Sequence, residues 1–272
     1  MAEAVPAPFD RPDVGFNALP GWTWVGCYGG YYLQCDLLDG FEHGFFTRQW
    51  QGREPEVLAG YLSAGVSVHR LQQVHGADVL PAGEAVVDPW PAGDGLVSDD
   101  GGQSLWVCGA DCTPVLLADP RRGAVAACHA GWRGVAARIL PAAIERLEAA
   151  GSRRTDLLVA LGPAVAGERY QVCREVSLQV GAALHATPPP ESGPESTLAS
   201  LRACGALAED PQPGRDRLDI RAASRHQLER CGIPAERIAV CPLCTVAEQE
   251  LFHSWRRDQV RAVQWSGIVA QA

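Results

Sequence analysis

Short apolar runs bounded by glycine, proline or aspartate recur along the chain, and they predict β-strands. These runs lie at residues 33–38, 70–74, 105–108, 115–118, 124–128 and 157–161. Neither an internal repeat nor a shift of composition marks a domain boundary. The pattern therefore gives no reason to divide residues 1–272 into separate domains.

Apolar residues at helical spacing predict two helices. The first follows the 124–128 strand after a glycine-containing turn and ends at Gly151. Its apolar face consists of Val135, Ile139, Ala143, Ile144 and Leu147. Pro141 lies within this helix and should bend it, because the proline ring clashes with the preceding turn. The second helix covers residues 219–231, with Asp219 as its N-cap and Gly232 as its stop.

The segment at residues 187–215 is rich in Pro, Ser, Glu and Gly and has little periodicity. We expect a mobile loop there. It is either a lid over a site or a solvated surface insertion, and we favour the insertion.

Composition indicates a globular protein that handles small molecules. Apolar residues make up 47% of the 272 positions, enough to bury a full core. A net charge of -9 gives no broad basic surface, so we expect no nucleic-acid partner. The first residues contain no signal-length apolar run, and no stretch is long enough to span a bilayer. We therefore expect a cytoplasmic protein without a membrane partner.

The chain contains no lysine, so all 23 basic residues are arginines. This excludes a lysine Schiff base, a pyridoxal-phosphate anchor and a P-loop lysine. Any bound phosphate must be held by arginine or by backbone N–H groups.

Ten cysteines in a cytoplasmic chain argue against a disulfide framework, and most should be buried fillers. Cys241 and Cys244 form a CxxC pair, which is typical of a redox pair or half of a zinc site. No second CxxC and no suitable His pair follows it, so we give that interpretation little weight.

Reactive side chains stand beside turn-forming glycines in segments 73–78 (QVHGAD), 93–97 (GDGLV), 110–114 (ADCTP) and 128–134 (CHAGWRG). His75, Cys112 and His129 offer two imidazoles and a thiolate, a good ligand set for tetrahedral zinc with a fourth position for water or substrate. The same residues also suit a metal-free cysteine hydrolase with Cys112 as nucleophile, His129 or His75 as base, and Asp111 or Asp94 as orienter. Taken singly, each is more often a core filler or a turn residue. Two imidazoles converging on one thiol favour metal.

Two other classes of metal enzyme fit poorly. Multicopper oxidases commonly use His-x-His pairs, and this chain has seven histidines without such a pair. Zinc nucleobase deaminases carry His-x-Glu, which is also missing.

In chain order, QVHGADV, GDGLVSD, ADCTPVLLADP and AACHAGWRGV resemble the YfiH/DUF152 family. Its members are also called polyphenol oxidase or laccase-domain proteins and peptidoglycan-editing-factor-like proteins. The resemblance extends from about Gly44 through Tyr170-Gln-Val, Cys244-Thr245 and Phe252-His-Ser-Trp-Arg-Arg257. It implies one α/β (α+β) domain of layered β-sheets flanked by helices, with zinc bound at His75, Cys112 and His129.

The resemblance also implies phosphorolysis of adenosine, guanosine, inosine and methylthioadenosine, together with adenosine deamination. Purine nucleoside and phosphate would then be the partners of a protein that we expect to be a monomer. Arg48 and Arg133 are the candidates for holding phosphate, since Arg133 lies where a helix begins. Asp111 or Asp94 would orient a ligand imidazole or move a proton. Alternatives are a Cys112-centred amidase acting on peptidoglycan precursors, a copper-dependent polyphenol oxidase, and a purely structural zinc site.

The chain departs from the family pattern in two places. After Phe46-Thr47-Arg48 the usual Gly-Gly-Val-Ser loop is replaced by a different, shortened segment at residues 49–65. The usual Gly-Arg continuation after Arg257 is also missing. The first departure changes part of the substrate pocket that the resemblance implies, and the second changes the C-terminal tail.

Overall fold

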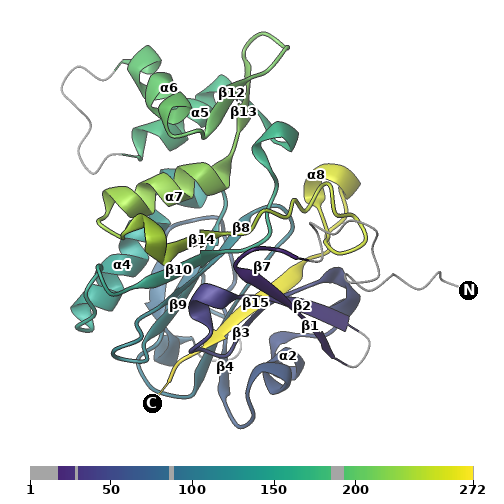
Figure 1. Cartoon of the computed structure of the whole chain (residues 1–272), viewed down its shortest axis with the longest axis vertical. Helices are drawn as coiled ribbons and strands as arrows, with labels where there is room; N and C mark the ends of the chain where they lie inside the picture. Colours follow the sequence, from purple (N-terminus) through teal and green to yellow (C-terminus); the bar gives the residue numbers. More distant parts are fainter. Residues whose placement is uncertain (1–17, 28–29, 86–88, 185–192, 272) are drawn as a thin grey trace, which may run out of the picture.

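The computed structural model describes residues 18–27, 30–85, 89–184 and 193–271, and its core is built from two six-stranded sheets packed face to face (Figure 1). The first sheet has the order β1 (Trp22–Cys27), β2 (Gly30–Cys35), β3 (His43–Phe46), β15 (Gln264–Val269), β7 (Gln103–Gly109) and β4 (Ser67–His69). The second has the order β14 (Ile238–Val240), β10 (Leu158–Leu161), β8 (Thr113–Ala118), β9 (Val125–Ala130), β6 (Gly95–Val97) and β5 (Val79–Pro81).

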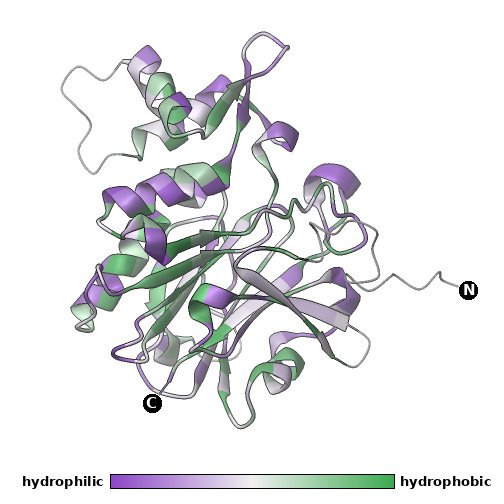
Figure 2. Ribbon diagram, in the orientation of Figure 1, coloured by the Kyte–Doolittle hydropathy of each residue, from purple (hydrophilic) through white to green (hydrophobic). Residues whose placement is uncertain are grey.

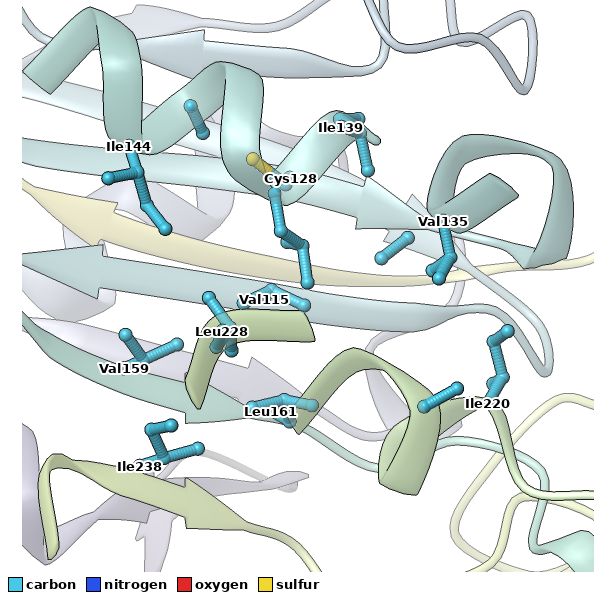
Figure 3. Packing of buried hydrophobic residues seen from close by; sticks show 14 of the residues in the cluster. Val115, Cys128, Val135, Ile139, Ile144, Val159, Leu161, Ile220, Leu228 and Ile238 are labelled. Carbon is cyan, nitrogen blue, oxygen red and sulfur yellow. The ribbon is translucent and has the colours of Figure 1, made fainter. Parts of the chain in front are cut away.

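Side chains of the second sheet point alternately to its two faces, so one face packs against helices and the other against the first sheet. In β8, Val115 and Leu117 point to the helical side, whereas Leu116 and Ala118 point to the first sheet. Figure 3 shows the helical side, where Val115, Val159 and Leu161 meet residues of the covering helices. Both faces of β8 are fully buried, which is why its sequence is a continuous apolar run.

Helices cover both outer faces of the paired sheets. Helix α2 (Pro55–Leu62) buries Leu58 and Ala59 against the first sheet, next to Trp106. On the other side lie α3 (Trp132–Ala136), α4 (Ile139–Ala149) and α7 (Ile220–Arg230). Figure 2 shows apolar residues along the strands and hydrophilic residues on much of α7. The predicted α/β architecture of layered sheets flanked by helices is confirmed.

A smaller unit extends from this core beyond α7 (Figure 1). It contains α5 (Arg174–Ala182), α6 (Pro194–Ala203) and the sheet β11 (Gln171–Cys173), β13 (Arg215–Leu218) and β12 (Leu207–Glu209). The expectation of a loop over 187–215 is therefore wrong for residues 194–203, 207–209 and 215, and residues 187–192 lie outside the described ranges. Leu198 and Leu201 of α6 are buried, and Gly181 lets the two helices approach closely, because a Cβ there would lie 2.5 Å from Thr197 Cγ2. Two buried apolar positions on a short helix give only a weak helical periodicity, which is why the sequence pattern did not predict α6.

The strand predicted at residues 70–74 is also wrong, because the strand is β4, three residues earlier. The Gln73 side chain instead hydrogen-bonds both backbone groups of Cys108, its Nε2 donating to the carbonyl and its Oε1 accepting from the N–H, each at 2.8 Å. These bonds replace a strand ladder. The 33–38 run is a strand only as far as Cys35, and Asp36–Leu38 form a 3₁₀ turn. The other four strand predictions match β7, β8, β9 and β10 within a few residues.

The helix predicted to begin near Val135 is split rather than bent. Arg138 adopts a left-handed conformation, with φ 67, between α3 and α4. Pro141 therefore falls in the first turn of α4, where its missing N–H has no helical acceptor to lose. The second predicted helix is confirmed as α7, where the Asp219 side chain accepts from the N–H groups of Arg221 and Ala222 and Gly232 follows with φ +90.

No helix in the described ranges is long and apolar enough to cross a bilayer.

Candidate metal centre

The predicted ligands meet at one end of the paired sheets. His75 lies between β4 and β5, Cys112 lies in the turn between β7 and β8, and His129 lies near the end of β9. Their ligand atoms all lie within 4.8 Å of one another. Ligand atoms bound at about 2.0–2.3 Å to one tetrahedral zinc ion lie about 3.3–3.8 Å apart, so small side-chain shifts would bring all three onto one ion. The structure therefore brings together the donor set that the sequence suggested.

Asp94 is the residue that holds the two imidazoles in place. Its Oδ1 pairs with His129 Nδ1 at 2.8 Å, which fixes that ring and leaves Nε2 for a ligand. Its two carboxylate oxygens also accept the backbone N–H groups of Val74, His75 and Gly76 at 3.1, 2.9 and 2.6 Å. Asp94 is 0% exposed, so these bonds replace all of its hydration. One carboxylate thus positions one ligand through its ring and the other through its backbone.

Backbone strain is concentrated at this centre. His75 has φ 62 and Asp111 has φ 98, both in the left-handed region that non-glycine residues rarely adopt. The hydrogen bonds to Asp94 account for His75, because they require three successive N–H groups to face one carboxylate. Gly131 is needed for space, since a Cβ there would lie 2.8 Å from Cys112 Sγ.

The thiol and the imidazole perturb each other strongly. Burial raises the pKa of Cys112, but hydrogen bonds from His129 and His75 outweigh it and lower the pKa to about 6. Burial lowers the pKa of His129, but its bonds to Asp94 and Cys112 raise it to about 9. Without metal, the lowered pKa of Cys112 and the raised pKa of His129 both favour the thiolate–imidazolium form of the pair. A thiolate is the form that binds zinc and also the form that attacks electrophiles.

Asp111 has a structural partner for each of its carboxylate oxygens. Oδ1 accepts from Thr245 Oγ1 at 2.7 Å, and Oδ2 accepts from the backbone N–H of Arg256 at 2.6 Å. Arg256 belongs to the short helix α8 (Trp255–Asp258). Asp111 therefore ties the C-terminal segment to the turn that carries Cys112.

That C-terminal segment forms one wall of a cavity of about 570 Å³ that contains all three ligands. The remaining wall includes Gln73, Cys108 and the backbone of Gly109 and Ala110. Trp255 and Val260 are 48% and 60% exposed, although both are large and apolar. Exposed apolar side chains around a metal-ligand group are typical of a site that receives a ligand with apolar surface.

The two arginines predicted to hold phosphate do not line this cavity. Arg48 donates through Nη1 to the carbonyl of Gln249 at 2.6 Å. Arg133 is exposed, and its guanidinium lies 4.4 Å from the ring centroid of Trp132. Their role in binding phosphate stays a prediction.

Residue spacing does not predict Trp255, Val260 or Arg261 as wall residues, because they lie more than a hundred positions from the ligands. The motif containing Trp255 was visible, but only through the family resemblance. Cys241 and Cys244 are buried, and all ten cysteines are free thiols.

Comparison with known proteins identifies the family of this chain. The sequence model of the family described as "Multi-copper polyphenol oxidoreductase laccase" matches residues 55–271. The chain belongs to this laccase-like family. The match includes His75, Cys112 and His129, but it begins after Arg53.

Relatives within the laccase-like family are named as phosphorylases. A purine nucleoside phosphorylase of Synechocystis sp. is 43% identical over 260 residues, which is 92% of this chain and 97% of the relative. YlmD of Geobacillus stearothermophilus, also named a purine nucleoside phosphorylase, has a crystal structure with a TM-score of 0.75 and 28% identity, covering 92% of this chain and 99% of YlmD. The structure of Bacillus licheniformis YfiH matches with a TM-score of 0.73, 24% identity and coverage of 91% and 99%, which supports the fold.

Proposed function

We propose that this protein is a zinc-binding purine nucleoside phosphorylase that acts on adenosine, guanosine, inosine and methylthioadenosine. The observation that carries the proposal is the 570 Å³ cavity, which combines the His75, Cys112 and His129 group with the exposed apolar wall of Trp255 and Val260. A planar purine has apolar faces that suit such a wall. The names of the relatives support the same reaction.

Zinc fits the donor set better than a multicopper arrangement does. Within the described ranges, His75, Cys112 and His129 are the one group of His, Cys, Asp or Glu residues with metal-site geometry. Laccase chemistry distributes electrons over several copper ions, which one three-ligand group does not hold. A bound zinc ion supplies a Lewis acid to the substrate. Copper-dependent phenol oxidation is therefore the weaker alternative.

Residues of this chain would position the metal ligands and the purine base. Asp94 keeps the His129 ring oriented and His75 turned towards the cavity. Trp255 and Val260 pack against the base and exclude water from one side of it. In phosphorolysis a phosphate oxygen bonds to the ribose C1′ while the glycosidic C–N bond breaks, and the departing purine takes up a proton. We propose that adenosine deamination, in which water replaces the 6-amino group, occurs in the same cavity.

The test is incubation of zinc-loaded protein with inosine, with and without inorganic phosphate. We expect hypoxanthine and ribose 1-phosphate in equal amounts, and only when phosphate is present. Adenosine without phosphate should yield inosine and ammonia at a lower rate. Hypoxanthine release that is independent of phosphate would contradict phosphorolysis, and absence of ammonia would contradict the second activity.

A second candidate function follows from the Cys112 thiolate. A half-buried cysteine with a pKa of about 6, beside an imidazole that is itself held by a carboxylate, has the arrangement of a cysteine hydrolase. An amide of a peptidoglycan precursor would be its substrate. This candidate predicts activity that survives chelation of metal and that is lost when Cys112 is alkylated.

A further inference from the structure

A second cavity, of about 180 Å³, adjoins the metal-site cavity. The two cavities share Arg261, Ala262 and Val263 as wall residues. The far wall of the second cavity contains Trp50 and Arg53 from the segment that departs from the family pattern. The family match begins at residue 55, after both of these residues.

Both arginines of this cavity lack a partner for their charge. The Arg53 guanidinium lies 4.7 Å from the ring centroid of Trp50, and its Nη1 is buried without a hydrogen-bond acceptor. Arg261 is exposed, and within the described residues its side chain makes no hydrogen bond or ion pair. A buried donor without an acceptor destabilises the protein unless a ligand or water satisfies it.

One carboxylate lines the same cavity, and it is paired with an arginine that is not among the lining residues. Glu54 Oε2 pairs with Arg70 Nη1 at 2.5 Å. Arg70 Nε also lies 3.5 Å from Glu56 Oε1. The guanidiniums of Arg53, Arg70 and Arg261 therefore exceed these two carboxylates by one positive charge, in a protein whose net charge is -9.

We infer that this cavity is a binding subsite for a phosphate group, held by Arg53 and Arg261. Guanidinium forks match phosphate oxygens in bidentate geometry, and a chain without lysine must rely on them. The stacking of Arg53 on Trp50 fixes the plane of its guanidinium before the ligand arrives. The phosphate is either the free co-substrate or the 5′-phosphate of a nucleotide. These two sources of the phosphate group rest on the proposed function, whereas the binding of phosphate at this subsite does not.

Calorimetric titration with inorganic phosphate tests the subsite without any reaction. The proteins are the zinc-loaded wild type, Arg53→Gln, Arg261→Gln and the control Arg202→Gln, which removes an exposed arginine on α6. We expect the Kd for phosphate to rise about tenfold to hundredfold in each of the first two variants and to stay unchanged in the control. A Kd within twofold of the wild type in both Arg53→Gln and Arg261→Gln overturns the inference. Arg261 makes no side-chain contact that folding needs, so Arg261→Gln keeps the test decisive if Arg53→Gln fails to fold.

Kinetics then separate the two sources. If free phosphate is the ligand, the KM for phosphate rises in both variants while the KM for inosine stays constant. If the 5′-phosphate is the ligand, adenosine monophosphate binds the wild type more than tenfold tighter than adenosine does, and the variants lose this preference. Phosphate binding that depends on both arginines, without any phosphorolysis, supports the subsite and counts against the proposed function. Phosphorolysis in which both variants keep the wild-type Kd and KM for phosphate supports the proposed function and counts against the subsite.

Discussion

The metal centre and the Arg53–Arg261 cavity share one wall but differ in how completely their polar groups are satisfied. At the metal centre, the buried Asp94 carboxylate accepts three backbone N–H groups and pairs with one imidazole. In the neighbouring cavity, Arg53 has a buried nitrogen without an acceptor. The first arrangement fixes side chains in advance, and the second leaves donors for a ligand. Substitutions should therefore abolish metal binding in one region and change only ligand affinity in the other.

The largest effect is expected for Cys112→Ala. Removing the thiolate leaves two neutral donors, so we expect the zinc content to fall to roughly a tenth or less of that of the wild type. Phosphorolysis should fall below detection. Elemental analysis of the purified variant measures the metal, and retention of full zinc occupancy would refute the ligand assignment.

Asp94→Asn should act on the same centre through the imidazoles. The variant keeps the size of the side chain but loses its charge, and we expect zinc affinity to fall about tenfold to hundredfold. Competition with a chelator of known affinity measures this change. Asp39→Asn, an exposed carboxylate elsewhere, is the matched control. Equal zinc affinity in the two variants would show that Asp94 does not hold the ligands.

The Cys112 thiolate predicts a pH dependence for the metal-free protein. Its pKa of about 6 in the folded state lies below that of an ordinary cysteine, so ionisation stabilises the fold above the ordinary pKa and this contribution is lost as pH falls through about 6. At pH 7 its thiolate fraction should exceed that of an exposed cysteine by roughly thirtyfold. Iodoacetamide labelling followed by peptide mass mapping measures the rate at Cys112. A labelling midpoint near that of an unperturbed thiol would contradict the proposed pairing with His129.

Trp255→Ala should produce the smallest change, because it alters a wall and leaves the ligands intact. We expect the KM for the nucleoside to rise about threefold to tenfold, since an aromatic contact is lost, while zinc content is unchanged. Trp255→Phe should restore most of the affinity. If only the KM for phosphate changed, the purine base would not contact Trp255. The assignment of the base to one cavity and of phosphate to the other would then be contradicted.

The fold could be anticipated wherever a single element carries a complete signal. Strand β8 is buried on both faces and reads as a continuous apolar run, and α7 has an N-cap and a glycine stop. Prediction failed where the signal is spread over distant residues. In the run at residues 70–74, Gln72 forms only an isolated β-bridge and the Gln73 side chain bonds to the Cys108 backbone, and α6 buries only two leucines.

By itself, the sequence determined the donor types of the metal centre, the family and the layered α/β architecture, because these depend on short motifs and on the period of apolar residues. The absence of lysine also determined that any phosphate is held by arginine or backbone. Only the tertiary structure decided that Asp94 holds the His129 ring and the His75 backbone, that Asp111 anchors α8, and that Arg53 and Arg261 line one cavity. Those relations join residues that are distant in the sequence, and the packing of the two sheets brings them together.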